Sequence, residues 1–271
     1  MVLVSKPPSA PVIARVKIRE NASRLSPQQL VAFRQAIAAT IELKDNRGYE
    51  FFAGWHGVPF QLCQHHNPYF LPWHRGYLYH FELALQDHNQ DVTLPWWDWV
   101  DEPGIPEAYF RKRVNRSANV LFDAPIEPYG VPVQPDWPKR TVREPGKLAN
   151  PAPLPPPLRP RYDWLMAAPS FTEFNRRLTL LHDNIHVWVG GTMGDSSWAA
   201  YDPIFWAHHT MVDRLWRIWQ HNNPGALPPR FVLEATMTYA RSPSFRGSDV
   251  LDVKQLGYDY AGTTATVPGS G

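Results

Sequence analysis

Cysteine is nearly missing from this sequence, which has only Cys63 among 271 residues. A disulfide within the chain is therefore excluded, and the thiol is an inert buried group, a reactive group or a ligand. An excess of charge of one sign is missing as well, because 27 Lys and Arg face 25 Asp and Glu, a net charge of +2. This balance excludes a surface built to bind nucleic acid. The function must therefore be sought in a localised site.

Long apolar runs are also absent. No stretch approaches the roughly 18 apolar residues of a membrane helix. Prolines interrupt residues 1–20, where a secretory signal would need an unbroken apolar run. We expect a soluble protein with no membrane partner, cytoplasmic by default, and export through a partner protein stays open.

Strand signals are weak, and no repeat of about 20 to 50 residues is visible. Helix signals are stronger. A proline at the first helical position follows Ser26 and again follows Asp202, while Ser170 and Glu173 have the spacing of a capping box. Apolar residues recur at helical spacing within each of the expected helices, which are 27–43, 74–88, 171–189 and 202–221. We therefore expect a mainly α fold.

A proline-rich stretch divides the chain. Residues 125–160 contain 12 of the 29 prolines, which predicts a long irregular loop over the surface without helices or central strands. Clusters of histidine flank this stretch and would have to meet across it. We therefore expect residues 1–271 to form a single domain with 125–160 as an insert loop.

The histidines fall into two groups. His182 and His186 are four residues apart, so their rings share one face of an expected helix and can bind one metal ion. The adjacent residues His208 and His209 on the next expected helix offer a third ligand, and spacing alone does not choose between them. A second set lies at equal intervals of nine, at His56, His65 and His74.

Imidazole suits zinc, copper, iron and nickel, so ligand type alone does not choose the metal. The His-Glu-x-x-His pattern of zinc proteases and the Glu-x-x-His pairs of di-iron bundles are both absent from these clusters. Two all-histidine sites favour a pair of copper ions, each cycling between Cu(I) and Cu(II), which together can pass two electrons to O2.

Four segments in order carry a family resemblance: "HGVPFQLCQHHNPYFLPWHRGYLYHFELAL" from residue 56, "LPWWDW" at 94–99, "HDNIHVWVGG" at 182–191 and "DPIFWAHHTMVDRLW" at 202–216. They resemble the type-3 dicopper proteins, which are tyrosinases, catechol oxidases and hemocyanins, and most closely the bacterial tyrosinases. The resemblance runs from about residue 20 to about residue 220. It implies a single catalytic domain in which a central four-helix bundle holds two copper ions, with long proline-rich loops.

The resemblance also assigns roles to the histidines. It implies that the first copper is bound by His56, His65 and His74, and the second by His182, His186 and His209. His208 then packs beside the site and His66 faces away from it. The spacing of Cys63 and His65 matches the family members in which a thioether joins the cysteine to the ring of that ligand. Asp202, Asp213, Arg75 and Arg214 are candidates for an ionic scaffold, and seven tryptophans in or beside the motifs are expected to form a dry shell.

Two acidic residues are candidate catalytic groups. Glu173, nine residues before His182, matches the family glutamate that positions a water over the coppers, although it could simply close a helix cap. Asp183 stands where tyrosinases usually have an asparagine, and a carboxylate offers no hydrogen-bond donor where an amide offers two. Two neighbouring carboxylates would tend to raise one pKa.

The function implied is O2-dependent ortho-hydroxylation of monophenols and oxidation of o-diphenols to o-quinones. Asp183 keeps open a catechol oxidase or o-aminophenol oxidase with little hydroxylase activity, and a hemocyanin-like O2 carrier or a zinc-binding protein are further alternatives. Small residues such as Ser196 and Ser197 after the Gly190-Gly191 turn imply an open pocket, with Val187 and the proline-rich loop at its rim. A copper-delivery chaperone and a homo-oligomer stay open.

Overall fold

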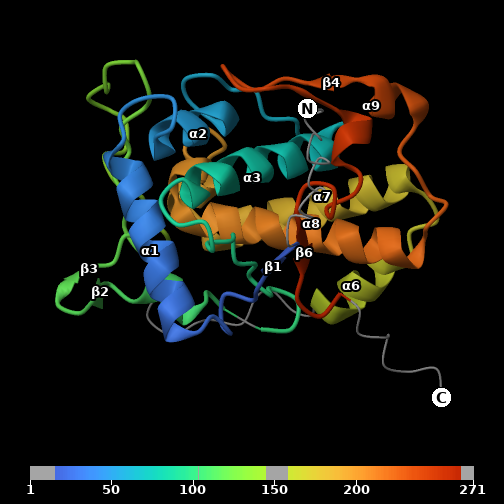
Figure 1. Cartoon of the computed structure of the whole chain (residues 1–271), viewed down its shortest axis with the longest axis horizontal. Coiled ribbons are helices and arrows are strands. Elements are labelled where there is room, and N and C mark those ends of the chain that lie inside the picture. The colour runs from blue at the N-terminus through green and yellow to red at the C-terminus, as the bar shows by residue number, and fades with distance from the viewer. Residues whose placement is uncertain (1–15, 103, 145–157, 264–271) are drawn as a thin grey trace, which may run out of the picture.

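The computed structural model describes residues 16–102, 104–144 and 158–263, and helices dominate it (Figure 1). The main helices are α1 (Pro27–Glu42), α2 (Tyr49–His56), α3 (Phe70–Gln86), α7 (Phe171–Val189) and α8 (Pro203–Asn222). The others are α4 (Glu107–Phe110), α6 (Leu158–Met166), α9 (Arg230–Glu234) and the 3-10 turns η1 (Gly191–Gly194), η2 (Ala199–Tyr201) and η3 (Gly247–Val250). No helix in the described ranges combines the length and the apolar character needed to cross a membrane.

The central bundle consists of α2, α3, α7 and α8, which carry five of the six clustered histidines discussed below. α3 packs against both α7 and α8, and α2 lies beside α3 at the end where η2 closes onto α8 (Figure 1). α1, which the sequence predicts as one of four main helices, packs on the outside of α2 and α3. The mainly α class is thus confirmed, with α2 in a place that the sequence pattern did not predict.

Capping residues fix where three of these helices begin. Ser26 accepts a hydrogen bond from the backbone of Gln29, whose side chain returns one to the backbone of Ser26, a complete capping box at α1. Asp202 caps α8 by accepting from the backbone N–H of Ile204. Ser170 caps α7 through the backbone of Glu173, but the Glu173 side chain turns away, so the box predicted there is half formed. α3 begins at Phe70, four residues before the predicted start.

Strand content is small, as the sequence predicts. β2 (Arg113–Val114) pairs with β3 (Ser117–Ala118) and β4 (Thr236–Met237) with β5 (Phe245–Arg246), both antiparallel. β1 (Lys17–Arg19) pairs in parallel with β6 (Tyr258–Tyr260), with Arg19 opposite Tyr260. This last pair brings residues 241 positions apart together beside α3 and α8 (Figure 1).

The proline-rich stretch is irregular over 125–144, where the strand pairing is limited to a single antiparallel bridge between Pro125 and Arg140. It is more deeply packed than a surface loop, because Arg143 is 3% exposed and binds Asp202 at the start of α8. The predicted loop is wrong at its end, since α6 begins at Leu158. Pro160 fits there because the first helical turn needs no backbone donor. Residues 145–157 lie outside the described ranges.

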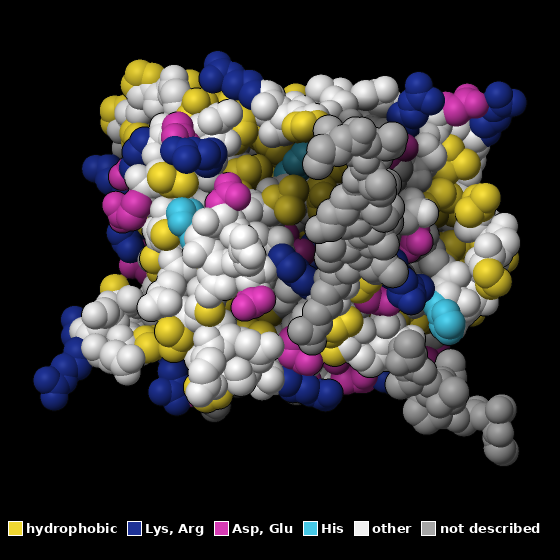
Figure 2. Space-filling view, viewed as in Figure 1, with side chains coloured by type: hydrophobic (Ala, Val, Ile, Leu, Met, Phe, Trp, Pro, Cys, Tyr) yellow, Lys and Arg dark blue, Asp and Glu magenta, His cyan; other side chains and the backbone are white. Residues whose placement is uncertain are grey.

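Aromatic side chains make up much of the core around the bundle. The seven tryptophans expected to form a dry shell are all buried: Trp73, Trp96, Trp97, Trp99, Trp188, Trp206 and Trp216. Phe81 of α3 stacks on Trp206 of α8 at 3.7 Å between ring centroids. On the surface, basic and acidic side chains intermingle over the face in Figure 2, in keeping with the balanced charge of the chain.

A buried ionic cluster joins α3, α8 and the β1–β6 pair. Arg75 of α3 donates to one oxygen of Asp213 on α8, and Arg19 of β1 lies 3.4 Å from the other oxygen. The hydroxyls of Tyr258 and Tyr260 also donate to Asp213. Burial raises the pKa of Asp213, but the two guanidinium groups outweigh it and hold that pKa below its usual range.

This cluster confirms Arg75 and Asp213 as scaffold residues, and the Arg143 pair confirms Asp202. Arg214 has a different role, because its guanidinium lies over the ring of Trp96 at 3.9 Å. Arg75 follows His74 and Asp213 comes four residues after His209, so the ionic cluster fixes α3 and α8 next to two of the histidines.

Replacing Asp213 by asparagine should destabilise the fold, because buried Arg75 loses its counter-charge and buried Arg19 keeps only Glu82. We expect a loss of about 3–5 kcal/mol of unfolding free energy at pH 7, measured by urea titration. Since the folded pKa is depressed, the carboxylate stabilises fully above its ordinary pKa of 3.8 and less as pH falls through the lower folded value. The difference between wild type and variant should therefore shrink only below about pH 4.

The matched control is Asp45→Asn, the same change in a half-exposed pair with Arg47. It should leave the unfolding midpoint nearly unchanged. Equal effects of the two substitutions would contradict the role given to the buried cluster.

Candidate metal centre

Six histidines from both halves of the chain meet in one place between the helices of the bundle. His56 is the last residue of α2, His65 lies in the segment before α3, and His74 is in the second turn of α3. α7 carries His182 and His186, and α8 carries His209. The structure therefore brings together all six residues that the sequence assigns to copper, across the proline-rich stretch.

Hydrogen bonds orient four of these rings through Nδ1. The acceptors are the carbonyl of Ser196 for His56 (3.1 Å), the carbonyl of Phe70 for His74 (2.8 Å), the carbonyl of Met193 for His186 (2.7 Å) and the carboxylate of Asp183 for His182 (3.0 Å). An oxygen acceptor requires the proton to be on Nδ1, which leaves Nε2 as a bare lone pair. Each of these rings is thus prepared to bind a cation through Nε2.

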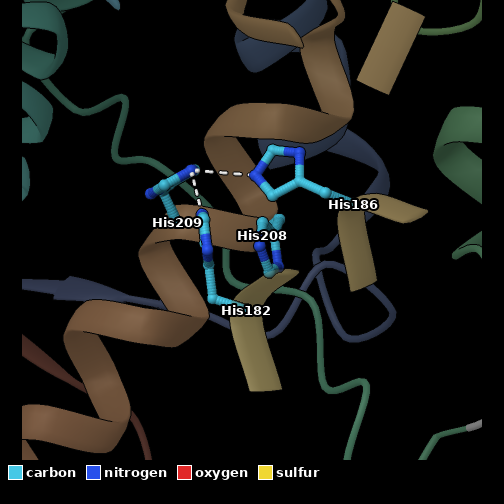
Figure 3. A group of neighbouring side chains, drawn as sticks. All are labelled: His182, His186, His208 and His209. Carbon is cyan, nitrogen blue, oxygen red and sulfur yellow. Dashed lines mark hydrogen bonds between the residues drawn. The ribbon is translucent and has the colours of Figure 1, made fainter. Parts of the chain in front are cut away.

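The Nε2 atoms converge. That of His209 lies 3.2 Å from His182 and 3.3 Å from His186 (Figure 3), and that of His56 lies 3.4 Å from His65. Bonds of about 2.0–2.1 Å to a tetrahedral metal would place two ligand nitrogens about 3.3 Å apart. Among the described residues, the buried Nε2 of His74 has no hydrogen-bond partner. Lone pairs that face one another at this spacing fit metal ions.

The protonation states fit as well. Burial lowers the pKa of all six histidines, and it lowers the pKa of His65 and of His186 to about 4. The rings are therefore neutral at pH 7, as metal ligands must be. The grouping of His56, His74 and His209 within 4.8 Å of one another shows that the two sets are adjacent.

His208 and His209 differ in orientation more than in distance. A ring nitrogen of His208 also lies within 4.8 Å of the ligand atoms of His182, His186 and His209. The His208 ring, however, stacks flat on that of His182, with centroids 5.0 Å apart, and Figure 3 shows it beside the point where the other three rings converge. We therefore propose His209 as the ligand and His208 as a packing residue.

Cys63 lies against the far side of the His65 ring. Its Sγ is 3.6 Å from Nδ1, while Nε2 of His65 faces His56. Burial raises the pKa of the thiol to about 11, so it is no ready nucleophile at neutral pH.

The structure does not place Glu173 over the histidines. Nine helical residues separate it from His182, which is two and a half turns, so it points to the opposite side of α7 about 13 Å along the axis. Its carboxylate accepts from Arg176 at 2.8 Å and Arg177 at 2.7 Å, and these hydrogen bonds lower its pKa to about 2. The predicted position above the metals, and the predicted effect of Glu173 on the pKa of Asp183, are therefore wrong.

Of the two predicted acidic residues, only Asp183 lies at the site. One oxygen accepts from Nδ1 of His182, and the other lies 3.5 Å from Nε2 of His66. Burial raises the pKa of Asp183, and neighbouring His66 partly offsets this. The predicted orientation of His66, away from the site, is wrong, because its ring lines the same cavity as Asp183. Only the fold could reveal this contact, since the two residues are 117 positions apart.

An open cavity of about 320 Å³ leads to the histidines. Its lining comprises His56, His65, His66, His182, Asp183, His186, Val187, Met193, Gly194 and Ser196. Val187, 74% exposed, lies at the mouth as predicted, and Ser196 is part of the wall. Residues 125–144 of the proline-rich stretch do not contribute to the lining. Asp183 is the one acidic residue that the described part of the chain contributes to this lining.

Comparison with known proteins places this centre in a family. The family model for the common central domain of tyrosinase matches residues 46–222. The chain belongs to the tyrosinase family. It is 31% identical over 235 residues to the tyrosinase of Streptomyces glaucescens, covering 77% of this chain and 84% of that one. This chain is a tyrosinase-family copper protein. Its cofactor is two copper ions, and the geometry of the histidine groups fits them.

Hemocyanins are relatives as well. The chain is 29% identical over 223 residues to hemocyanin 2 of Megathura crenulata, covering 74% of this chain but 6% of that protein. A functional unit of octopus hemocyanin has the same fold, with a TM-score of 0.76 and 24% identity over 91% of this chain and 68% of that one. An Aspergillus oryzae pro-tyrosinase mutant is equally similar, with a TM-score of 0.75 and 21% identity over 93% and 70%. Relatives with both names thus share this architecture.

Replacing His209 by glutamine should remove a ligand whose Nε2 faces both His182 and His186. We expect the purified variant, after copper loading and dialysis, to retain about one copper per chain where wild type retains two, as measured by plasma mass spectrometry. His208→Gln is the matched control and should retain both ions. The reverse result would make His208 the ligand.

Proposed function

We propose that this protein is a phenol oxidase that uses copper and O2 to hydroxylate monophenols at the ortho position and to oxidise o-diphenols to o-quinones. The observation that carries the proposal is the open cavity, because it leads from the surface to the imidazoles. Its volume of about 320 Å³ lies at the lower end of the usual range for small-molecule sites, about 300–1,000 Å³. A single aromatic ring can therefore approach the metal centre.

Bound copper would supply the redox chemistry, since two ions that each change by one electron can together pass two electrons to O2. In the diphenol reaction, two catechols give two o-quinones while one O2 is reduced to two waters. The six imidazoles would hold the metals, with His56, His65 and His74 at one ion and His182, His186 and His209 at the other. Hydrogen bonds at Nδ1 of four rings keep those rings from turning, which preorganises the site before substrate arrives.

Asp183 is the residue placed to receive the phenol hydroxyl. A carboxylate only accepts hydrogen bonds, a phenol donates one, and Asp183 lies on the cavity wall between His66 and His182. With Glu173 paired to arginines on the other side of α7, Asp183 is the group proposed to take up the proton of a monophenol.

A catechol or o-aminophenol oxidase is the second candidate. Asp183 in place of the usual asparagine, together with the absence of Glu173 from the cavity, favours it, because o-diphenols react without the hydroxylation step. An O2 carrier is a third candidate in view of the hemocyanin relatives, but the open cavity favours an enzyme.

Oxygen uptake by the copper-loaded protein should separate these candidates. We expect consumption of O2 with 4-methylphenol, with 4-methylcatechol and with o-aminophenol. Asp183→Asn should slow the monophenol reaction by about tenfold or more, the size of a general-base contribution, and change the catechol reaction much less. If wild type oxidises only the catechol, the protein is a catechol oxidase. If it binds O2 without consuming it, the protein is an O2 carrier. An unchanged monophenol to catechol ratio in Asp183→Asn would remove Asp183 from the hydroxylation step.

We also propose that Cys63 forms a thioether with the ring of His65, since its Sγ lies 3.6 Å from that ring. The reaction would break one S–H and one C–H bond, form a C–S bond and pass two electrons and two protons to O2. A crosslink would fix the one ligand of the first set that lies in a loop.

Intact mass spectrometry tests this crosslink. After loading with copper in air, the protein should lose the mass of two hydrogens, and Cys63 should no longer react with iodoacetamide under denaturing conditions. Cys63→Ser should show no loss of mass. A thiol that stays fully alkylatable in the copper-loaded protein would contradict the bond.

A further inference from the structure

A second cavity adjoins the histidine cavity, and the proposed reaction does not use it. It has a volume of about 270 Å³ and lies over α7 and the segment that leads into α3. Its lining comprises His66, Asn67, Pro68, Thr172, Asn175, Arg176, Thr179 and Leu180. His66 lines both cavities, so the two spaces meet at this side chain.

The position of His66 connects the two spaces. Its side chain is 67% exposed, and its backbone adopts a φ of 53°, a left-handed conformation that is unfavourable for histidine. The contact with Asp183 is a long one at 3.5 Å. An accessible ring therefore lies at the boundary of both spaces, where a molecule that fills one can reach the other.

The walls of the second cavity indicate what would enter it. Pro68, Leu180 and the threonine methyl groups offer apolar contact, and Leu180 is 44% exposed at its edge. Arg176 is not a free cation, because its guanidinium already binds both oxygens of Glu173. Among the described lining residues a charged group would therefore find no unpaired counter-ion, whereas a neutral, largely apolar group would fit.

One polar atom adds a requirement. Asn175 donates through Nδ2 to the carbonyl oxygen of Asn67 at 3.0 Å, which fixes its amide so that Oδ1 is the remaining atom. That oxygen is buried and has no hydrogen-bond partner among the described residues, and the residue is 6% exposed. A buried acceptor without a donor costs about 1–3 kcal/mol, so a ligand that brings an N–H would be favoured.

We propose that the second cavity binds the para substituent of the phenol whose ring occupies the histidine cavity. It would select substrates with a neutral tail that carries an amide N–H, such as N-acylated phenolic amines, over unsubstituted small phenols. This inference rests on the proposed phenol oxidase function. It makes Leu180 and Asn175 residues that determine specificity.

Three catechols test the proposal, since they need no hydroxylation step: 4-methylcatechol, 4-pentylcatechol and N-acetyldopamine. For wild type we expect kcat/KM to rise in that order, by about tenfold from first to last, through burial of the tail and the added hydrogen bond. Leu180→Trp should fill the cavity and abolish the difference while leaving 4-methylcatechol turnover as in wild type. Leu227→Trp, the same change at another exposed leucine, should retain wild-type preference.

The outcomes separate the two proposals. No turnover of 4-methylcatechol by wild type would overturn the phenol oxidase function. Equal kcat/KM for all three catechols, or a preference that survives Leu180→Trp, would overturn the proposed role of the second cavity and leave the phenol oxidase function standing. A preference for 4-pentylcatechol over N-acetyldopamine would contradict the role of Asn175. In metal-free protein, calorimetry should show tighter binding of N-acetyltyramine than of 4-methylphenol, and equal binding would also count against the tail site.

Discussion

Six neutral imidazoles that turn their Nε2 atoms toward one another are the constraint on which this structure depends. These atoms lie 3.2–3.4 Å apart in three pairs, and without metal a pair forms a hydrogen bond only if one of its two rings carries its proton on Nε2. Four rings carry that proton on Nδ1 instead, so other contacts must hold them in place. Backbone carbonyls anchor three rings through Nδ1 and Asp183 anchors a fourth. The surrounding tryptophans exclude water, which lowers each histidine pKa and keeps the rings neutral. The same arrangement that is costly when empty is therefore well suited to two copper ions.

The buried charges complete this arrangement at a distance from the metals. Asp213 receives Arg75 from α3 and Arg19 from β1, and so connects α8 with the helix that carries His74 and with the terminal strand pair. Arg143 does the same for the start of α8 from within the proline-rich stretch. Because a buried carboxylate is stable only with its partners in place, these contacts specify one arrangement of the helices. Segments far outside the histidine motifs thereby help to determine the metal geometry.

Sequence alone predicts those parts of the fold that have a local cause. Ser26 and Asp202 are capping residues followed by proline, so α1 and α8 begin where expected. α2 escapes prediction because all eight of its residues are buried, which leaves no polar face and no helical period. Histidine spacing identifies the ligand candidates, because an i, i+4 pair shares one helix face wherever that helix packs. The place of Glu173 depends on which side of α7 faces the cavity, and its neighbours Arg176 and Arg177 compete for it, which spacing does not reveal.

An anchored centre and an exposed rim separate the contacts that hold the metals from the groups that control access to them. Most of the histidines lie on helices and are anchored from behind, so substitutions there would affect the metals themselves. The groups that meet an incoming molecule, His66 and Val187, are exposed and lightly held, and Leu180 forms the edge of the adjoining space. Changes at these positions can alter access and selectivity at little cost in stability. Among the described residues Asp183 is the one carboxylate at this rim, and the open entrance and the adjoining cavity support the proposed turnover of a substituted phenol over storage of O2.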